Sequence, residues 1–191
     1  MKRFKKTTTL VFAVLLSAGA SFAQQSYSLT GPVEMKVSGT STIHDWDMVA
    51  EDGVSGQAQM TMENGKLSKI GSLSISMDVK SLKSGKSAMD KNAYAALDAN
   101  KHAKITFQLS EVMSISASEV KAKGKLTIAG NSQTLTLTAP YQISGNQIKF
   151  YGKHDISFSQ FSLEAPTAVF GTIKTGDELT LSFQTTFSPK N

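Results

Sequence analysis

Histidine is the side chain in this sequence best suited to acid–base or metal chemistry, and the chain has three of them. His44 and His154 are each followed by an aspartate, whereas His102 is not. No two histidines have the i, i+4 spacing of a metal site on a helix or the i, i+2 spacing of one on a strand. A metal site would need all three brought together from separate strands, so we predict neither a metal nor a cofactor.

Nucleophilic and carboxylate catalysis have no clearer basis in the residues. Serine is abundant, but none lies in a G-x-S-x-G elbow. Adjacent residues of a strand point to opposite faces, so His44 and Asp45, or His154 and Asp155, do not form catalytic pairs. Paired carboxylates for glycoside hydrolysis are not identifiable either. We therefore predict no catalytic residue, and a metal-dependent hydrolase that uses His44 and His154 is the third hypothesis for function.

The N-terminus has the organisation of a secretory signal peptide. A segment with four basic residues precedes an apolar stretch, Leu10–Leu16, and then a run of small residues. Ser21 and Ala23 occupy the two positions that a signal peptidase reads. We predict a signal peptide over residues 1–23, cleaved after Ala23, and a periplasmic or secreted mature protein of residues 24–191.

The predicted leader also accounts for most of the formal net charge of +5. Without its four basic residues, sixteen of the twenty Lys and Arg residues face fifteen Asp and Glu. The single arginine, Arg3, is lost with the leader. A nearly neutral chain without arginine forks is a poor nucleic-acid binder, so we predict no nucleic-acid partner. The absence of cysteine excludes a disulfide scaffold, a thiolate zinc site and a cysteine nucleophile.

Short segments that alternate apolar and polar residues make up most of the remaining chain. Period-two alternation indicates strands with one buried and one solvated face, and it occurs at Val33–Val37, Leu73–Val79, Ile105–Leu109, Leu135–Thr138 and Leu179–Phe183. Turn residues separate such segments at Glu51–Gly53, Glu63–Lys66, Ala129–Asn131 and Ser144–Asn146. We therefore predict an all-β, antiparallel protein.

Two segments depart from the alternation. Ser87–Asn100 is rich in alanine and places Met89, Ala93 and Leu97 four residues apart, which predicts a helix of about three turns. Ser87 is the predicted cap at its start. Residues 160–176 contain Pro166 and two glycines, which predicts a loop.

The number of predicted strands decides the fold class. One flat sheet could not hide its apolar face behind a single helix, whereas a closed barrel or a sandwich could. A barrel of about eight strands can be filled by its own side chains or can enclose one apolar ligand. The residues leave both interiors open, and they indicate one domain.

Three motifs in order resemble the YceI-like family. They are Ser38–Trp46, which is similar to the opening of members from Bacteroidetes-type bacteria, Asp78–Gly85 with the helix and Lys104–Phe107 that follow it, and Gly124–Asn131, which resembles the G-x-L-T-I-x-G stretch. The resemblance covers nearly all of residues 33–187. It implies a lipocalin-like antiparallel β-barrel of about eight strands with one inserted helix near a mouth, secretion, and a polyisoprenoid or other long-chain lipid in the channel.

The chain departs from the family pattern in two places. The Arg-Asp pair that is common before the helix is Met89-Asp90 here, which removes an arginine that could contact a headgroup. The Phe-Gly near the last strands is Phe161-Ser162.

Apolar side chains of the alternating segments, with a few polar neighbours, are the candidate ligand contacts. Flexible thioethers and aromatic rings suit a channel for a long apolar chain, although core packing explains many of them equally well. His44 is placed on the same strand face as Trp46 and Met48, where it could meet a headgroup or bond its own strand. The predicted ligand-binding residues are His44, Trp46, Met48, Met60, Ile75, Met77, Tyr94, Phe107, Ile128, Phe150, Phe158 and Phe183.

The first hypothesis for function is a carrier without catalytic activity. It sequesters a polyisoprenoid, an isoprenoid quinone or a fatty-acid-like lipid inside the barrel. The alternative is an envelope or stress-response interaction module with a filled core. Transient contact with a membrane surface and a homodimer are compatible with either. Lysines around the predicted helix could meet an anionic headgroup or a membrane, or form a solvated rim: Lys80, Lys83, Lys86, Lys91, Lys101 and Lys104.

Overall fold

The computed structural model describes residues 24–190, so the predicted signal peptide lies outside the described residues. The strands are β1 (Gln25–Leu29), β2 (Glu34–Ser41), β3 (Trp46–Ala50), β4 (Val54–Glu63), β5 (Lys66–Asp78), β6 (Lys104–Ile115), β7 (Glu119–Ile128), β8 (Asn131–Ser144), β9 (Gln147–Ser157), β10 (Thr167–Ala168) and β11 (Ile173–Pro189). The helices are the 3₁₀ turns η1 (Val79–Ser81) and η2 (Ser159–Phe161) and the α-helix α1 (Ser87–Ala96). The predicted all-β class with one inserted helix is confirmed.

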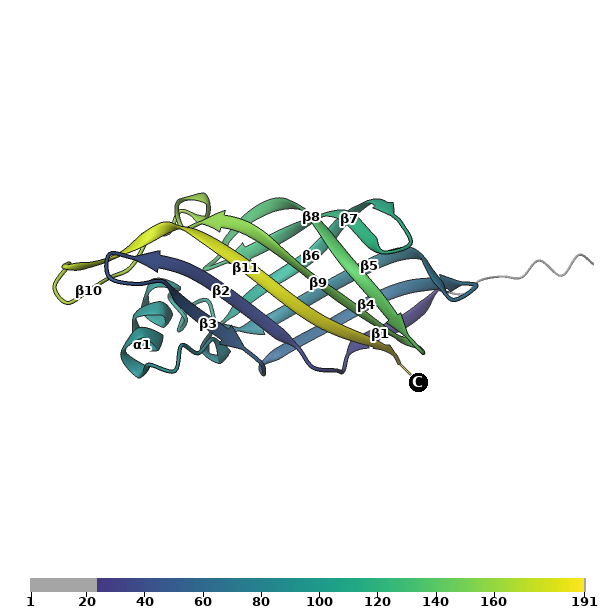
Figure 1. The fold of residues 1–191 in the computed structure, drawn as a ribbon, viewed down its shortest axis with the longest axis horizontal. Coiled ribbons are helices and arrows are strands. Elements are labelled where there is room, and N and C mark those ends of the chain that lie inside the picture. The colour runs from purple at the N-terminus through teal and green to yellow at the C-terminus, as the bar shows by residue number, and fades with distance from the viewer. Residues whose placement is uncertain (1–23, 191) are drawn as a thin grey trace, which may run out of the picture.

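Eight strands close into an antiparallel barrel, in the order β1, β4, β5, β6, β7, β8, β9, β11 (Figure 1). The ring closes because β1 pairs with β4 on one side and with β11 on the other, where Leu29 lies opposite Phe187. Closure leaves the sheet without an open edge at this level and turns one face of every strand inward. The barrel, rather than the sandwich, is thus the architecture.

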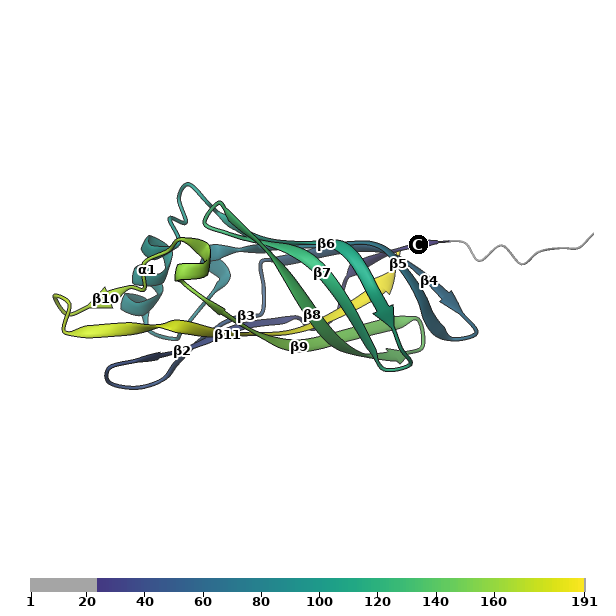
Figure 2. The same cartoon turned by 90° about the horizontal axis from the view of Figure 1, so that it is seen from above.

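The two ends of the barrel are built differently. On the side of β11 away from β9, the neighbouring strand changes along its length. Near the C-terminus this neighbour is β1, but over Thr175–Gln184 it is β2, which in turn pairs with β3. At the far end from the C-terminus lie α1, the β2–β3 loop and the β10–β11 hairpin (Figures 1 and 2). We call this end the mouth and the opposite one the closed end. Within residues 24–190 no helix has the length and apolarity needed to span a bilayer.

The closed end is filled by a cluster of buried side chains. Phe187 and Ile148 have no exposed surface, and the rings of Phe150 and Phe187 meet edge to face with centroids 6.2 Å apart. Tyr141 stacks at a tilt on Phe150, and its hydroxyl donates a hydrogen bond to the carbonyl of Ser116 at 2.8 Å. Eight inward faces converge here, so this end supplies the packed core.

Local sequence determines the tight turns as predicted. Asn64-Gly65 and Ala129-Gly130 each have two consecutive residues with positive φ, as a two-residue hairpin between right-twisted strands requires. The other two predicted turns connect β3 to β4 and β8 to β9.

The predicted helix is confirmed, but its predicted cap was wrong. Ser87 is the first helical residue and Lys86 holds the cap position without a side-chain hydrogen bond. Instead, the Asp90 carboxylate accepts hydrogen bonds from the Ser84 amide at 2.8 Å and hydroxyl at 2.6 Å. Burial by itself raises the pKa of Asp90, but these two bonds, together with the positive charge of Lys83, outweigh it and hold the pKa below its usual value. The helix ends at Ala96, before the predicted Asn100.

Residues 160–176 are more ordered than the predicted loop. They contain the end of η2, the short strand β10 and the start of β11. Phe161, 1% exposed, packs with Leu135 of β8 and Ile156 of β9, where those two strands are no longer hydrogen-bonded to each other. Gln133 of β8 donates to the Gln160 carbonyl at 2.7 Å. The segment thus closes the wall between β8 and β9.

Acidification should loosen this segment before it unfolds the barrel. Asp177 accepts hydrogen bonds from the Ser159 amide at 2.9 Å and hydroxyl at 2.5 Å, and these bonds hold the pKa of Asp177 below its ordinary 3.8. A lowered folded pKa means that the stabilisation is complete above the unfolded pKa and is lost as pH falls through the folded pKa. We expect the Ser159 amide resonance to titrate below pH 3.8. In Asp177→Asn that titration should vanish, and its persistence would assign it to another group.

Candidate ligand-binding cavity

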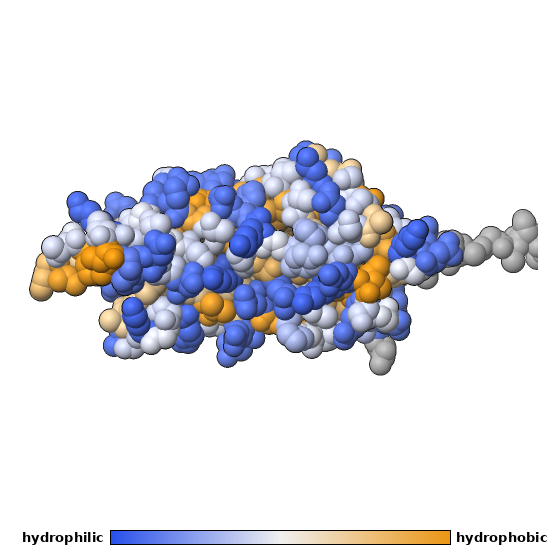
Figure 3. Space-filling model, in the orientation of Figure 1, coloured by the Kyte–Doolittle hydropathy of each residue, from blue (hydrophilic) through white to orange (hydrophobic). Residues whose placement is uncertain are grey.

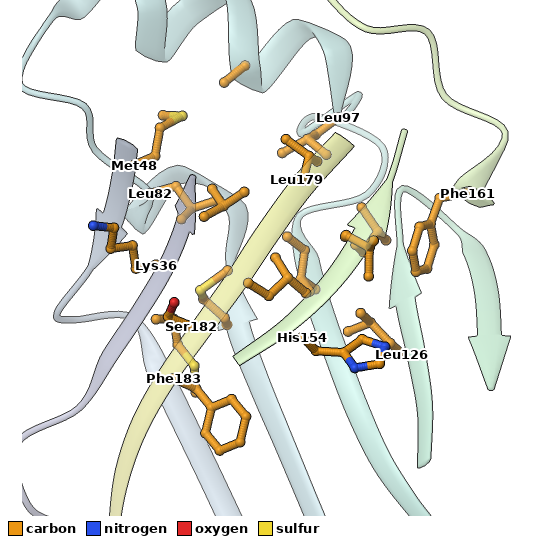
Figure 4. A pocket seen from close by; sticks show the side chains of 18 of the residues that line it. Lys36, Met48, Leu82, Leu97, Leu126, His154, Phe161, Leu179, Ser182 and Phe183 are labelled. Carbon is orange, nitrogen blue, oxygen red and sulfur yellow. The ribbon is translucent and has the colours of Figure 1, made fainter. Parts of the chain in front are cut away.

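A cavity of about 520 Å³ extends from the mouth of the barrel to the closed-end cluster, whose Ile70, Val120 and Phe150 line its inner end (Figure 4). Its wall comes from β2, β3, β5 to β9 and β11, and α1 and the segment after η2 cover it. None of the described residues of β1 or β4 lines it. The interior is therefore neither wholly filled nor wholly hollow: side chains pack the closed end beside β1 and β4, and the space left by the other strands widens toward the mouth.

Alternation along the strands makes this wall apolar. Leu126 and Ile128 on β7, and Leu135 and Leu137 on β8, point inward while the residues between them face solvent. Met48 and Leu82 add apolar surface beside the helix. Such a wall offers van der Waals contact along its whole length and suits a flexible hydrocarbon chain.

Glycines on the inward face let aromatic rings lie flat against the wall. A Cβ at Gly124 would collide with the Phe107 ring of the neighbouring strand, and one at Gly39 with the Trp46 ring. At Gly152 a Cβ would lie 2.8 Å from Cζ of Phe183. These three glycines keep the rings out of the centre of the cavity, and so they contribute to its width.

Ten of the twelve predicted ligand contacts line the cavity. They are His44, Trp46, Met48, Ile75, Met77, Phe107, Ile128, Phe150, Phe158 and Phe183. The barrel brings them together from six strands and two connecting segments because each lies on an inward-facing position or at the mouth. Their contact with a ligand stays a prediction.

Met60 and Tyr94 do not line the cavity. Met60 lies on β4 and is fully buried in the closed-end cluster beside Ala58, since the β4 face is covered by the floor of the barrel. The hydroxyl of Tyr94 lies 2.6 Å from the Leu82 carbonyl and accepts a hydrogen bond from Nζ of Lys83 at 2.9 Å. Tyr94 thus fastens α1 to the segment after η1, which is a structural role.

His44 lies at the mouth rather than on a strand. β3 begins two residues later, so His44 is an exposed loop residue on the rim of the cavity. Its Nδ1 lies 2.7 Å from the Asp45 carbonyl, which ties the ring to its own loop. The Lys86 side chain stands on the same rim, and both also border a smaller polar hollow beside the mouth. Asp45 and Asp47 border the same hollow, so the rim carries polar groups of both charges.

His154 is the residue whose place sequence reasoning missed. It follows Phe150 and Gly152 on the inward face of β9, and its imidazole points into the cavity (Figure 4). The alternating pattern of β9 contains this signal, but from the sequence His154 is weighed only for metal binding and catalysis. Within residues 24–190 no three His, Asp or Glu side chains cluster as metal ligands. His102 packs against Gly130 at the β7–β8 turn.

Comparison with known proteins places this barrel among relatives. The sequence profile of the YceI-like domain matches residues 36–187. Among curated protein sequences none matches this chain.

Solved structures with the same fold share little sequence with it. Burkholderia cenocepacia BcnA superposes with a TM-score of 0.67 at 19% identity over 81% of this chain and 95% of its own. A polyisoprenoid binding domain from Saccharophagus degradans, implicated in plant cell wall breakdown, has a TM-score of 0.67 at 12% identity, covering 87% of this chain and 100% of its own. The Campylobacter jejuni YceI protein has a TM-score of 0.57 at 15% identity, covering 100% and 99%.

Proposed function

The chain belongs to the YceI-like family, and from that premise we propose that it is a periplasmic or secreted carrier that sequesters a long-chain apolar lipid inside its barrel. Membership supports lipid binding in general. The observation that carries the proposal for this chain is the apolar cavity of about 520 Å³ that opens at the mouth. The cargo class is a polyisoprenoid, an isoprenoid quinone or a fatty-acid-like chain.

Burial of hydrocarbon supplies the binding free energy. Each methylene removed from water contributes about 0.8 kcal/mol, so a five-carbon prenyl unit contributes roughly 3–4 kcal/mol before the costs of ordering and association. This mechanism shelters the chain from water and requires no reaction, so we assign no catalytic residue.

The two ends of the ligand would meet different surroundings. An apolar wall cannot pair a phosphate or carboxylate, and burying an unpaired charge is costly. A charged headgroup would therefore stay at the mouth, near Lys86 and His44, while the chain extends toward Phe150. Three other lysines of the helix region have protein partners: Lys80 donates to Asn100, Lys83 to Tyr94 and Lys104 to Asp78.

Extraction of the purified protein tests the proposal. Residues 24–191, exported to a bacterial periplasm and purified without detergent, should yield a long-chain lipid in about stoichiometric amount by mass spectrometry of the organic extract. An empty extract that stays empty after incubation with prenols and fatty acids would instead favour an interaction module.

The mouth also has a surface suited to lipid contact. Of the large apolar residues that are most exposed in residues 24–190, three lie at this end: Ile43, Val169 and Phe170. Val169 and Phe170 form the tip of the β10–β11 hairpin, where Figure 3 shows an apolar patch. Two hydrogen bonds join the Ile43 loop to this hairpin: the Thr42 amide donates to the Lys174 carbonyl at 3.0 Å, and the Lys174 amide donates to the Thr42 hydroxyl at 3.2 Å. We propose that this tip touches a bilayer when cargo is exchanged.

Removing the exposed ring should weaken that contact. Phe170→Ser is expected to lower binding to phosphatidylcholine vesicles about tenfold, since a Phe side chain buried in an apolar phase gains about 1.5–3 kcal/mol. Co-sedimentation measures the effect, and Met113→Ser, an exposed apolar residue away from the mouth, is the control. Equal loss in both variants would contradict a specific role of the hairpin.

A further inference from the structure

His154 stands at mid-depth in the cavity. On β9 the inward positions run from Phe150 at the floor through Gly152 and His154 to Ile156 near the mouth. Across the strand pair His154 lies opposite Leu181, and Ile156 opposite Leu179. The imidazole is thus set between apolar levels of the wall, well inside the rim that carries His44 and Lys86.

The imidazole has no hydrogen-bond partner within residues 24–190, unlike the rings of Trp46, Tyr141 and His44. The indole N–H of Trp46 donates to the Thr40 carbonyl at 3.0 Å, and the hydroxyl of Tyr141 donates to the Ser116 carbonyl at 2.8 Å. His44 is held by its own loop. The imidazole of His154, by contrast, faces the cavity.

An unpaired polar group in an apolar site discriminates between ligands. A saturated hydrocarbon at this depth would displace water from the imidazole and leave its N–H without an acceptor, which is costly. A ligand with an oxygen at the same depth replaces the lost hydrogen bond. Sites of this kind reject the analogue that lacks the polar atom.

The surroundings also restrict the charge of that oxygen. Lys36 turns away from the cavity to pair with Asp47 at 2.9 Å, and Lys86 stays at the rim. A phosphate at the depth of His154 would thus be buried without a lysine partner. A carbonyl, ester or hydroxyl oxygen needs no counter-charge.

We propose that His154 is a specificity-determining residue that selects cargo with an uncharged oxygen partway along its chain. The inference rests on the proposed lipid-binding function and names a chemical feature of the cargo. Thr185 is a second polar residue on the inward face of these strands, but it lies deeper, opposite Phe150, and is 1% exposed. It therefore serves as the matched control.

A series of linear ketones tests the proposal. Heptadecane and its 2-, 5- and 9-ketones carry the same chain and place a carbonyl acceptor at different depths. Their dissociation constants are measured by displacement of the fluorescent probe N-phenyl-1-naphthylamine from wild type, His154→Leu, His154→Gln and Thr185→Val. The affinity of each ligand is compared between variants. The free energy of hydration of the free ligand is the same for every variant, so it cancels in this comparison.

In His154→Leu, the affinity for one of the ketones should fall about fivefold to tenfold more than the affinity for heptadecane. A difference of this size corresponds to the loss of one net hydrogen bond. His154→Gln, which keeps an N–H donor, should retain part of the preference, and Thr185→Val all of it. If His154→Leu does not fold, His154→Phe gives the same comparison.

If the His154 variants change the affinity for heptadecane and for every ketone by the same factor, the proposal is overturned and the proposed lipid binding is left intact. A preference abolished by Thr185→Val rather than by the His154 variants would overturn it as well. If no variant and no wild-type sample binds any of the four compounds, the proposed function fails and this inference with it.

Discussion

Ala139→Trp is expected to abolish tight binding of long-chain ligands while leaving the fold intact. Ala139 points into the inner part of the cavity from β8. An indole there occupies room for on the order of five methylenes, each worth about 0.8 kcal/mol. The upper limit is a loss of about 4 kcal/mol, or nearly a thousandfold. We expect a loss of affinity of about a hundredfold, since the ligand chain can shift toward the mouth. Displacement of the same fluorescent probe measures this loss.

The neighbouring residue supplies the control. Thr138 belongs to the same strand but faces solvent, so Thr138→Trp adds the same side chain outside the barrel. Its ligand affinity should match wild type, and both variants should unfold near the wild-type temperature. If Ala139→Trp is unstable, Leu137→Trp fills the cavity one inward position nearer the mouth. Unchanged affinity in a folded cavity variant would place the ligand elsewhere.

Phe187→Ala should have the largest effect on stability. The Phe187 ring has no exposed surface, meets Phe150 edge to face and covers Gly56 of β4. Truncating a buried Phe costs about 3–5 kcal/mol, because transfer free energy is lost and a cavity remains. Urea unfolding of the two proteins measures the difference.

A matched aromatic residue separates burial from ring loss. Tyr151 lies on the outward face of β9 and is 36% exposed, so Tyr151→Ala should cost about 1 kcal/mol or less. A similar cost for both variants would mean that the closed end does not dominate the stability of the barrel.

The sequence was sufficient for those features that depend on neighbours along the chain. Alternation within each segment indicated which residues face inward, and the Asn64-Gly65 turn is confirmed. The strands are longer than their alternating pieces, however. β8 continues through Pro140, because that residue still pairs with Glu119 across the sheet although it interrupts the local pattern.

What the sequence could not supply depends on contacts between distant segments. Met60 and Phe107 both lie on inward faces, but whether such a position borders space or packed side chains depends on what fills the barrel at that level. The β4 residues meet Phe187 and Ile148 from the other end of the chain, which excludes them from the cavity. Likewise Ser87 had the right type for a cap, but the chain folds back so that Ser84 bonds Asp90 instead.

The division of the barrel into a packed closed end and an open mouth half means that different residues carry different selective constraints. Substitutions at Phe187 or Ile148 disturb folding itself, whereas the wall around His154 bears mainly on what is bound. New cargo preferences could therefore arise by exchange of wall residues without rebuilding the part that folds the chain. The same division recommends the scaffold for engineering, because a library confined to the wall near the mouth would leave the packed cluster of the closed end untouched.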